Sequence, residues 1–134
     1  MTYPAAVLWD MDGTLVDSEH YWLRSEQELA ASAGKLWTEQ DGMNMIGMSL
    51  YDSSRLIKQK LELDIPAEEI IDRLTNSVIS KLETSLPWRP GAQELLREVR
   101  AAGIPTALVT MSMRRNADAV VQRMGFDAFD LIIA

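Results

Sequence analysis

Three short apolar runs, separated by longer helical segments, constrain the fold of this chain more than any other feature. The runs cover residues 5–9, 106–110 and 130–134, and each is too short to form a helix. The segments between them carry apolar residues at the three-to-four spacing of amphipathic helices. Strands that alternate with helices form a parallel sheet with helices packed on it. The sequence therefore predicts an α/β fold whose three strands are buried.

The segment between the first and second predicted strands is far longer than a single crossover helix. Its pattern is helical throughout residues 18–86, so we expect an inserted α-helical domain there and an α/β core made of residues 1–17 and 87–134. About three strands give an incomplete Rossmann-like parallel sheet, because a doubly wound fold usually has five or six. We interpret the sequence as the front part of a longer protein. The alternative is a short domain that completes its sheet by pairing with another chain.

Capping side chains and prolines indicate where the helices begin. Asp17 or Ser18 is expected to cap the helix after the first strand. Other predicted helix starts are Thr38 or Asp41, Ser49, Pro66, Pro90 and Ser112, the last for a helix that runs to Met124. The methionines of the inserted segment, Met43, Met45 and Met48, are interpreted as core residues because methionine fills irregular gaps.

Composition excludes several classes of protein. The net charge is −7 and the basic residues are scattered, whereas a nucleic-acid binder needs clustered Lys and Arg, so no nucleic-acid partner is expected. No apolar run approaches the roughly 20 residues that span a bilayer, so no membrane partner is expected either. The chain has no cysteine, which fits a protein of the reducing cytoplasm.

The residues that follow the first predicted strand carry the strongest chemical signal. They read Asp10-Met11-Asp12-Gly13-Thr14, and ligands of open parallel sheets bind at this edge. Two carboxylates two residues apart in extended backbone lie on one side and are best held together by a cation such as Mg²⁺. One aspartate can attack a phosphoryl group while the other transfers a proton. Gly13 lets the backbone approach a bound ligand closely.

These residues resemble motif I of the haloacid dehalogenase-like (HAD) hydrolases. The matching stretch runs from Trp9 to Glu19 and reads WDMDGTLVDSE. It is most similar to the branch with a helical cap inserted after motif I, the branch of β-phosphoglucomutase and many sugar-phosphate phosphatases. RPGAQELL, from Arg89, resembles the segment that re-enters the core, and LVTMS, from Leu108, resembles motif II. The resemblance implies that residues 18–86 form the cap.

The resemblance also implies a role for each matching residue. Asp10 would be the nucleophile and a magnesium ligand. Asp12 would be the general acid and base, with its backbone carbonyl also binding the metal. Thr110 would hydrogen-bond a phosphoryl oxygen. The backbone N–H groups of Met111 and Ser112 lie at a predicted helix N-terminus, where an anion is favoured.

Two further motifs of the family do not occur in this sequence. In the family, the motif III lysine and the motif IV acids follow the third strand, whereas this sequence ends at Ala134. Positioning and electrostatic stabilisation provide most of the catalysis of phosphoryl transfer. We therefore expect the 134-residue chain by itself to be nearly inactive.

The resulting expectation is a Mg²⁺-dependent phosphatase that acts on a small phosphorylated metabolite through an aspartyl-phosphate intermediate. One alternative is a phosphomutase similar to β-phosphoglucomutase. Leu50 argues against it, because it takes the place of an arginine that grips the second phosphate in that enzyme, and leucine cannot make that contact. The other alternative is a non-catalytic module that binds a partner chain, or a second copy of itself, through an unfinished sheet edge.

Overall fold

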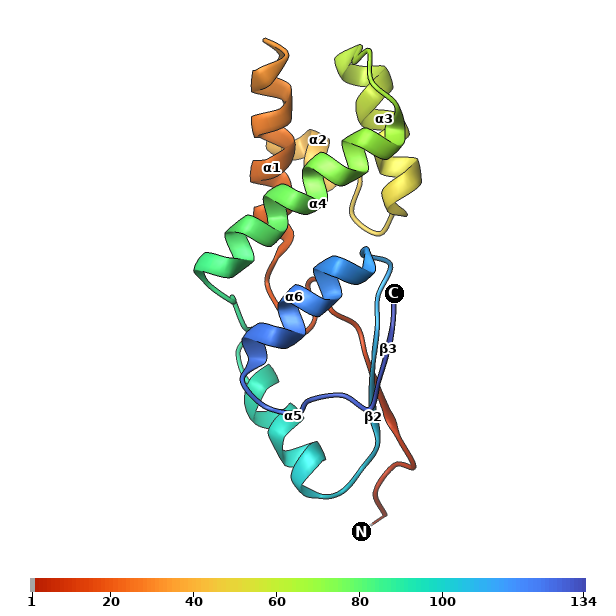
Figure 1. The fold of residues 1–134 in the computed structure, drawn as a ribbon, viewed down its shortest axis with the longest axis vertical. Helices are drawn as coiled ribbons and strands as arrows, with labels where there is room; N and C mark the ends of the chain where they lie inside the picture. The colour runs from red at the N-terminus through yellow and green to blue at the C-terminus, as the bar shows by residue number, and fades with distance from the viewer. Residues whose placement is uncertain (1) are drawn as a thin grey trace. The chain divides into compact units, whose positions relative to one another are not determined.

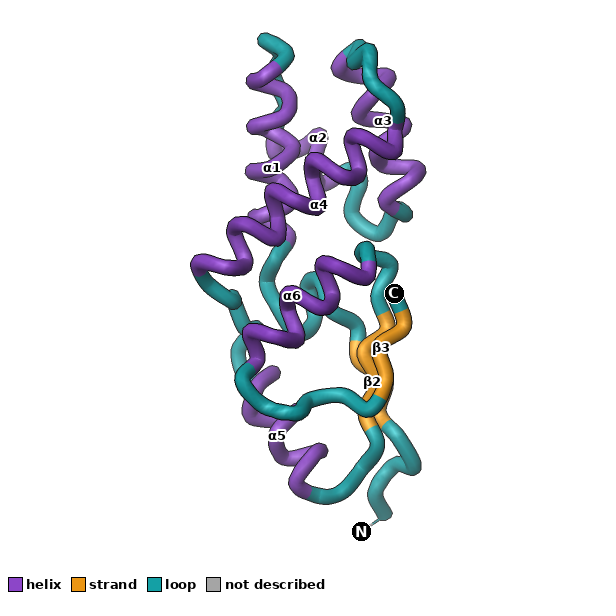
Figure 2. Tube along the Cα trace, in the orientation of Figure 1, coloured by secondary structure: helices purple, strands orange, loops and turns teal. Residues whose placement is uncertain are grey.

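A computed structural model describes residues 2–134 and confirms the α/β class. The strands are β1 (Val7–Trp9), β2 (Thr106–Val109) and β3 (Leu131–Ile133). They form one parallel sheet in the order β1-β2-β3, and Figure 2 draws its strands in orange. The register places Leu8 opposite Ala107, and Ala107 opposite Leu131.

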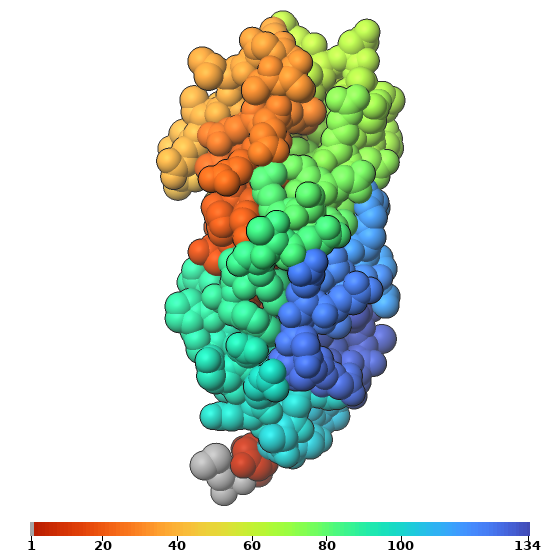
Figure 3. Space-filling view, turned by 60° about the vertical axis from the view of Figure 1, so that its left-hand side comes forward, coloured from red at the N-terminus to blue at the C-terminus, as the bar shows by residue number. Residues whose placement is uncertain are grey.

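Helices α5 (Ala92–Ala101) and α6 (Arg114–Met124) lie on the same side of this sheet (Figure 1). Connections between parallel strands are right-handed, and the strand order makes both connections advance in the same direction, so both helices fall on one face. Leu96 of α5 and Val120 of α6 are fully buried. Figure 3 shows the outer surface that the side chains of these two helices form (cyan and blue).

The opposite face of the sheet, which we call the open face, carries exposed apolar side chains. It consists of Leu8 and Leu131, which the register aligns with Ala107, and of Val109 and Ile133, which are aligned with each other. Leu8 is 70% exposed and Leu131 is 55% exposed. The prediction of buried strands is therefore wrong for β1 and β3 and holds for most of β2. An apolar run identifies a strand, but it does not show whether helices cover one face or both.

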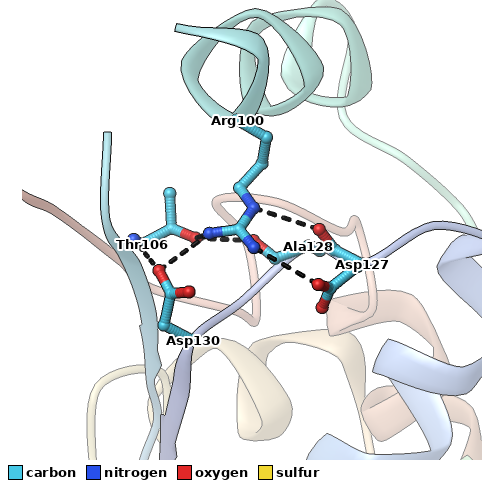
Figure 4. Close-up of polar contacts among 5 residues, drawn as sticks. All are labelled: Arg100, Thr106, Asp127, Ala128 and Asp130. Carbon is cyan, nitrogen blue, oxygen red and sulfur yellow. Dashed lines mark hydrogen bonds and ion pairs between the residues drawn. The ribbon is translucent and has the colours of Figure 1, made fainter. Parts of the chain in front are cut away.

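Arg100 of α5 ties this helix to the amino ends of β2 and β3 (Figure 4). Its Nη1 donates to Thr106 Oγ1 at 3.2 Å and to Asp130 Oδ2 at 2.7 Å, and its Nε donates to the Asp127 carbonyl at 3.0 Å. Thr106 donates its N–H to the same Asp130 oxygen at 2.9 Å and its hydroxyl to the Ala128 carbonyl at 2.6 Å. The Thr106 N–H, followed by Arg100, lowers the pKa of Asp130. The connection that precedes β3 is thereby fixed.

The segment between β1 and α5 is helical, as predicted. It contains α1 (Glu19–Ser32), α2 (Glu39–Met43), α3 (Leu50–Leu61) and α4 (Ala67–Thr84). One apolar cluster holds these helices together, and its buried members are Leu29, Ala30, Trp37, Met45, Ile57, Leu61, Ile70 and Leu74. Met45 is a core residue as predicted, whereas Met43 and Met48 are exposed. The reason is that α2 ends at Met43 and the chain turns at Gly47, where φ is +86°.

Most of the helix starts were predicted to within one residue. Thr38 caps α2 in a reciprocal capping box with Asp41, and Ser49 Oγ accepts the Asp52 N–H at the start of α3. The prediction for α5 is wrong by two residues. Gly91, with φ of +80°, is the N-cap, so its left-handed conformation separates Pro90 from the helix that begins at Ala92.

The structure divides into two compact units. One, the sheet unit, contains the chain up to Glu19 together with Leu82–Ala134, and the other, the helical unit, is His20–Lys81. These boundaries differ from the expected ones because the last turn of α4, including the buried Leu82, belongs to the sheet unit. The interpretation of the two units as a catalytic core and a cap remains a prediction.

Candidate active site

A tight turn after β1 presents the first predicted catalytic residue. Met11 and Leu15 are fully buried and anchor this turn, and the N–H groups of Thr14 and Leu15 donate to the Met11 carbonyl at 3.2 and 3.0 Å. Asp10 precedes the anchor and is exposed. Thr14 Oγ1 donates to Asp10 Oδ2 at 3.0 Å. The buried residues thus hold the turn, and the carboxylate of Asp10 faces solvent at the carboxyl end of β1.

Gly13 is required by the conformation of this turn. Its φ is +78°, in the left-handed region that favours glycine. A Cβ at this position would lie 2.7 Å from Oε1 of Glu19, so the flexible end of that side chain would have to move, and the positive φ is the stronger reason for the glycine. The sequence predicted that Gly13 would permit close approach of a ligand. The structure provides a conformational reason for the glycine, and the role toward a ligand remains a prediction.

Asp12 accepts hydrogen bonds on both oxygens of its carboxylate. Ser18 Oγ donates to Oδ1 at 2.5 Å, and Ser112 Oγ donates to Oδ2 at 2.7 Å. Both serines are buried, at 1% and 7% exposure. Ser112 lies 100 positions further along the chain, so its bond joins the turn after β1 to the segment after β2. The structure therefore brings together the two motifs that the sequence placed at one edge of the sheet.

Thr110 and Ser112 form a second small turn after β2. The Thr110 N–H donates to the Ile133 carbonyl at 2.9 Å, and Thr110 Oγ1 accepts the Ser112 N–H at 3.1 Å. The predicted capping role of Ser112 is wrong. The N-cap of α6 is Met113, with no capping side chain, because the Ser112 hydroxyl donates to Asp12 instead. Met111, whose backbone N–H was predicted to bind phosphate, is an exposed residue.

The oxygen ligands that the residues offer fit a magnesium ion whose remaining coordination positions are filled by substrate and water. Mg²⁺ is commonly bound through one or two carboxylates and substrate phosphate. Asp10 offers an exposed carboxylate, whereas both carboxylate oxygens of Asp12 already accept hydroxyl hydrogen bonds. Within residues 2–134, no three His, Cys, Asp or Glu side chains are grouped closely enough to hold a metal ion. Asp10 is therefore the side chain best suited to bind it.

Two residues of this site were not predicted from the sequence. Ser18 was interpreted only as a helix cap, and Thr14 was given no separate role. Both are hydroxyl residues in the same short segment as the two aspartates, at four positions from Asp10 and six from Asp12. A hydroxyl within reach of a carboxylate is a natural donor to it. That spacing is the signal in the sequence that could have identified them.

Comparison with known families identifies the family of this chain. The family model for "haloacid dehalogenase-like hydrolase" matches residues 4–134. This chain belongs to the haloacid dehalogenase-like hydrolases. The resemblance seen in the turn after β1 is thus confirmed over residues 4–134.

Individual relatives cover the same region. A phosphorylated carbohydrates phosphatase of Thermotoga maritima is 27% identical over 129 residues, which is 96% of this chain and 60% of the relative. The structure of CbbY from Rhodobacter sphaeroides in complex with phosphate aligns with a TM-score of 0.82 at 24% identity, over 97% of this chain and 63% of CbbY. The β-phosphoglucomutase of Clostridium difficile aligns with a TM-score of 0.78 at 22% identity, over 97% and 61%.

The chain spans about three fifths of the length of these three relatives. The two structural alignments, at this level of identity, show a shared fold. Among the helices that the structure describes, none is both long and apolar enough to cross a membrane.

Proposed function

We propose that this hydrolase is a magnesium-dependent phosphatase of small phosphorylated metabolites. The observation that carries the proposal is the 2.7 Å hydrogen bond from Ser112 to Asp12, because it joins the predicted proton-transfer residue to the predicted phosphate-binding segment. The similarity to a phosphatase of phosphorylated carbohydrates supports the same reaction and substrate class.

In the first step, a carboxylate oxygen of Asp10 attacks phosphorus and the bond from phosphorus to the leaving oxygen breaks. Asp12, as a carboxylic acid, donates its proton to that oxygen, so an alcohol departs and an aspartyl phosphate remains. In the second step, Asp12, now a carboxylate, takes a proton from a water molecule that attacks phosphorus. Asp10 is then released as a carboxylate together with phosphate, and Asp12 is a carboxylic acid again.

The remaining residues position the phosphoryl group. The Thr110 hydroxyl can donate outward because it accepts the Ser112 N–H. This N–H is engaged with Thr110, so we assign the phosphate contact to the Thr110 hydroxyl ahead of the Ser112 N–H. Mg²⁺ bound at Asp10 supplies positive charge that offsets the charge of carboxylate and phosphate.

The residue at the start of α3 favours hydrolysis over a mutase reaction. By the resemblance to β-phosphoglucomutase, Leu50 takes the place of an arginine that grips the second phosphate, and leucine carries no charge for it. A mutase must hold a substrate that carries two phosphates at one stage of its cycle. Water is therefore the proposed acceptor of the phosphoryl group.

The test is phosphate release from sugar phosphates and other small phosphate monoesters by the protein at its natural length, with Mg²⁺ and with EDTA. We expect activity that needs Mg²⁺ and that falls at least about 100-fold in Asp10→Asn. Asp17→Asn, an exposed aspartate of the same segment, is the matched control and should remain active. Equal activity of Asp10→Asn and the unsubstituted protein would refute the proposed nucleophile.

A further inference from the structure

We infer that Ser18 and Ser112 are positioning residues that hold Asp12 in the orientation required for proton transfer. This inference rests on the proposed function. The two serines approach Asp12 from different parts of the sheet unit, since Ser18 directly precedes α1 and Ser112 lies between β2 and α6. Each donates to a different carboxylate oxygen, at 2.5 and 2.7 Å.

Two donors on separate oxygens restrain a carboxylate more than one donor can. A single hydrogen bond leaves the side chain able to rotate about its Cα–Cβ and Cβ–Cγ bonds, whereas two bonds to opposite oxygens from different segments oppose both rotations. Bonds from hydroxyls to an ionised carboxylate are short and roughly twice as strong as neutral ones, which agrees with the distances at Asp12. Because both serines are buried, water has little access to compete for these hydrogen bonds.

The same pair of serines can serve Asp12 in both of its protonation states. A hydroxyl carries one donor and two acceptor lone pairs, and its hydrogen can rotate. When Asp12 is a carboxylate, both serines donate to it. When it carries a proton, one hydroxyl can turn and accept that proton in a hydrogen bond until the leaving oxygen takes it. The carboxyl group is thus held in place without losing the ability to transfer a proton.

Ser112 also aligns Asp12 with the phosphate-binding segment. Its N–H donates to Thr110 Oγ1 at 3.1 Å while its hydroxyl donates to Asp12 at 2.7 Å. One residue therefore sets the spacing between the proposed proton donor and the proposed phosphate contact. Proton transfer depends steeply on such geometry.

The experiment compares two substrates that differ in their need for a proton donor. An alkyl phosphate releases a strongly basic alkoxide and requires protonation, whereas p-nitrophenyl phosphate releases a stable phenolate and needs little. We expect Ser18→Ala and Ser112→Ala to lower the ratio of kcat/KM for the alkyl ester to that for the nitrophenyl ester by about tenfold or more, within the range that general acid catalysis contributes. Ser112→Thr, which keeps the hydroxyl, should restore most of the ratio.

Ser32→Ala is the matched control, because Ser32 donates to the Leu29 carbonyl in the helical unit, and the ratio should not change. A structural defect lowers both substrates equally, so an unchanged ratio in both serine variants overturns the inference. A failure of the proposed function is recognised separately, because phosphate release would then persist in Asp10→Asn or be absent from the unsubstituted protein.

A second readout does not depend on turnover. Three-bond Hα–Hβ NMR couplings report whether the Asp12 side chain occupies one χ1 rotamer. We expect one rotamer in the unsubstituted protein and averaged couplings in the Ser18→Ala/Ser112→Ala double variant. The same couplings in both proteins would show that the serines do not position Asp12.

Discussion

Glu26 lies buried in the helical unit, where its carboxyl group has an unusual environment. It belongs to α1, and the indole Nε1 of the buried Trp37 donates to its Oε1 at 3.1 Å. Burial raises the pKa of Glu26 to about 7, and the Trp37 hydrogen bond opposes that shift only in part. Gly42 of α2 approaches closely, because a Cβ there would lie 3.2 Å from the same oxygen. Glu26 is therefore protonated in the folded protein under mildly acidic conditions.

This burial predicts a pH dependence of stability with a definite sign. The unfolded state loses the Glu26 proton near pH 4.5 and the folded state near pH 7, so the free energy of unfolding should fall as pH rises between these values and level off above pH 7. The shift corresponds to about 3 kcal/mol at most. Glu26→Gln should remove this decrease in urea unfolding measured at pH 5 and pH 8.

The control for Glu26→Gln is Glu83→Gln, an exposed glutamate, which should show the same pH dependence as the unsubstituted protein. If Glu26→Gln and the unsubstituted protein lose equal stability between pH 5 and pH 8, then Glu26 is already ionised when buried and the account of it is wrong.

At the scale of single elements, the strands and helices were predicted better than the side-chain contacts between them. The strand Thr106–Val109 and the caps at Thr38 and Ser49 have local physical causes, namely a short apolar run and short polar side chains, and these are visible in sequence. The partners of Ser112 and Arg100 lie 100 and up to 30 positions away. Such contacts exist only once the elements have packed, so local patterns could not predict them.

Arg100 provides a prediction at this scale, because its guanidinium joins α5 to β2 and to the chain that precedes β3 (Figure 4). Arg100→Met keeps the aliphatic stem but removes hydrogen bonds to Thr106 and Asp130. We expect it to lower the free energy of unfolding by about 1–3 kcal/mol, as is usual for hydrogen bonds with a charged partner. Urea unfolding followed by circular dichroism measures this loss.

Arg123→Met on the exposed surface of α6 is the matched control and should change the free energy of unfolding by no more than about 0.5 kcal/mol. Similar unfolding curves for the Arg100 and Arg123 variants would mean that the contacts of Arg100 with β2 and with the chain before β3 contribute nothing measurable.

At the scale of the whole molecule, the sequence predicted the architecture, but it did not predict that one face of the sheet lacks helices. The order of strands and helices was enough to predict a parallel sheet and a helical insertion. The open face, with Leu8 and Leu131 exposed, depends on which side both crossover helices occupy, and that follows from strand order. The buried side chain of Asn116 in α6, which has no hydrogen-bond partner among the described residues, was not anticipated either.

In the candidate site too, some features follow from local sequence patterns and others only from the packing of the folded chain. Asp10, Asp12, Gly13 and Thr110 could be selected from the sequence because a strand end, a turn and a second strand end converge in any parallel sheet. The engagement of Asp12 by two serines depends on how α6 begins and on where the chain leaves for α1. Those details required the folded chain.

The central claim is that Asp10 accepts a phosphoryl group beside a magnesium ion. Beryllium fluoride tests it most directly, because with Mg²⁺ it forms a stable analogue of an aspartyl phosphate on a nucleophilic carboxylate without any turnover. The ¹⁹F NMR spectrum of the protein at its natural length, with Mg²⁺ and beryllium fluoride, should contain protein-bound fluorine resonances that disappear in Asp10→Asn and on addition of EDTA. Bound resonances that persist in Asp10→Asn, or none in the unsubstituted protein, would contradict the account.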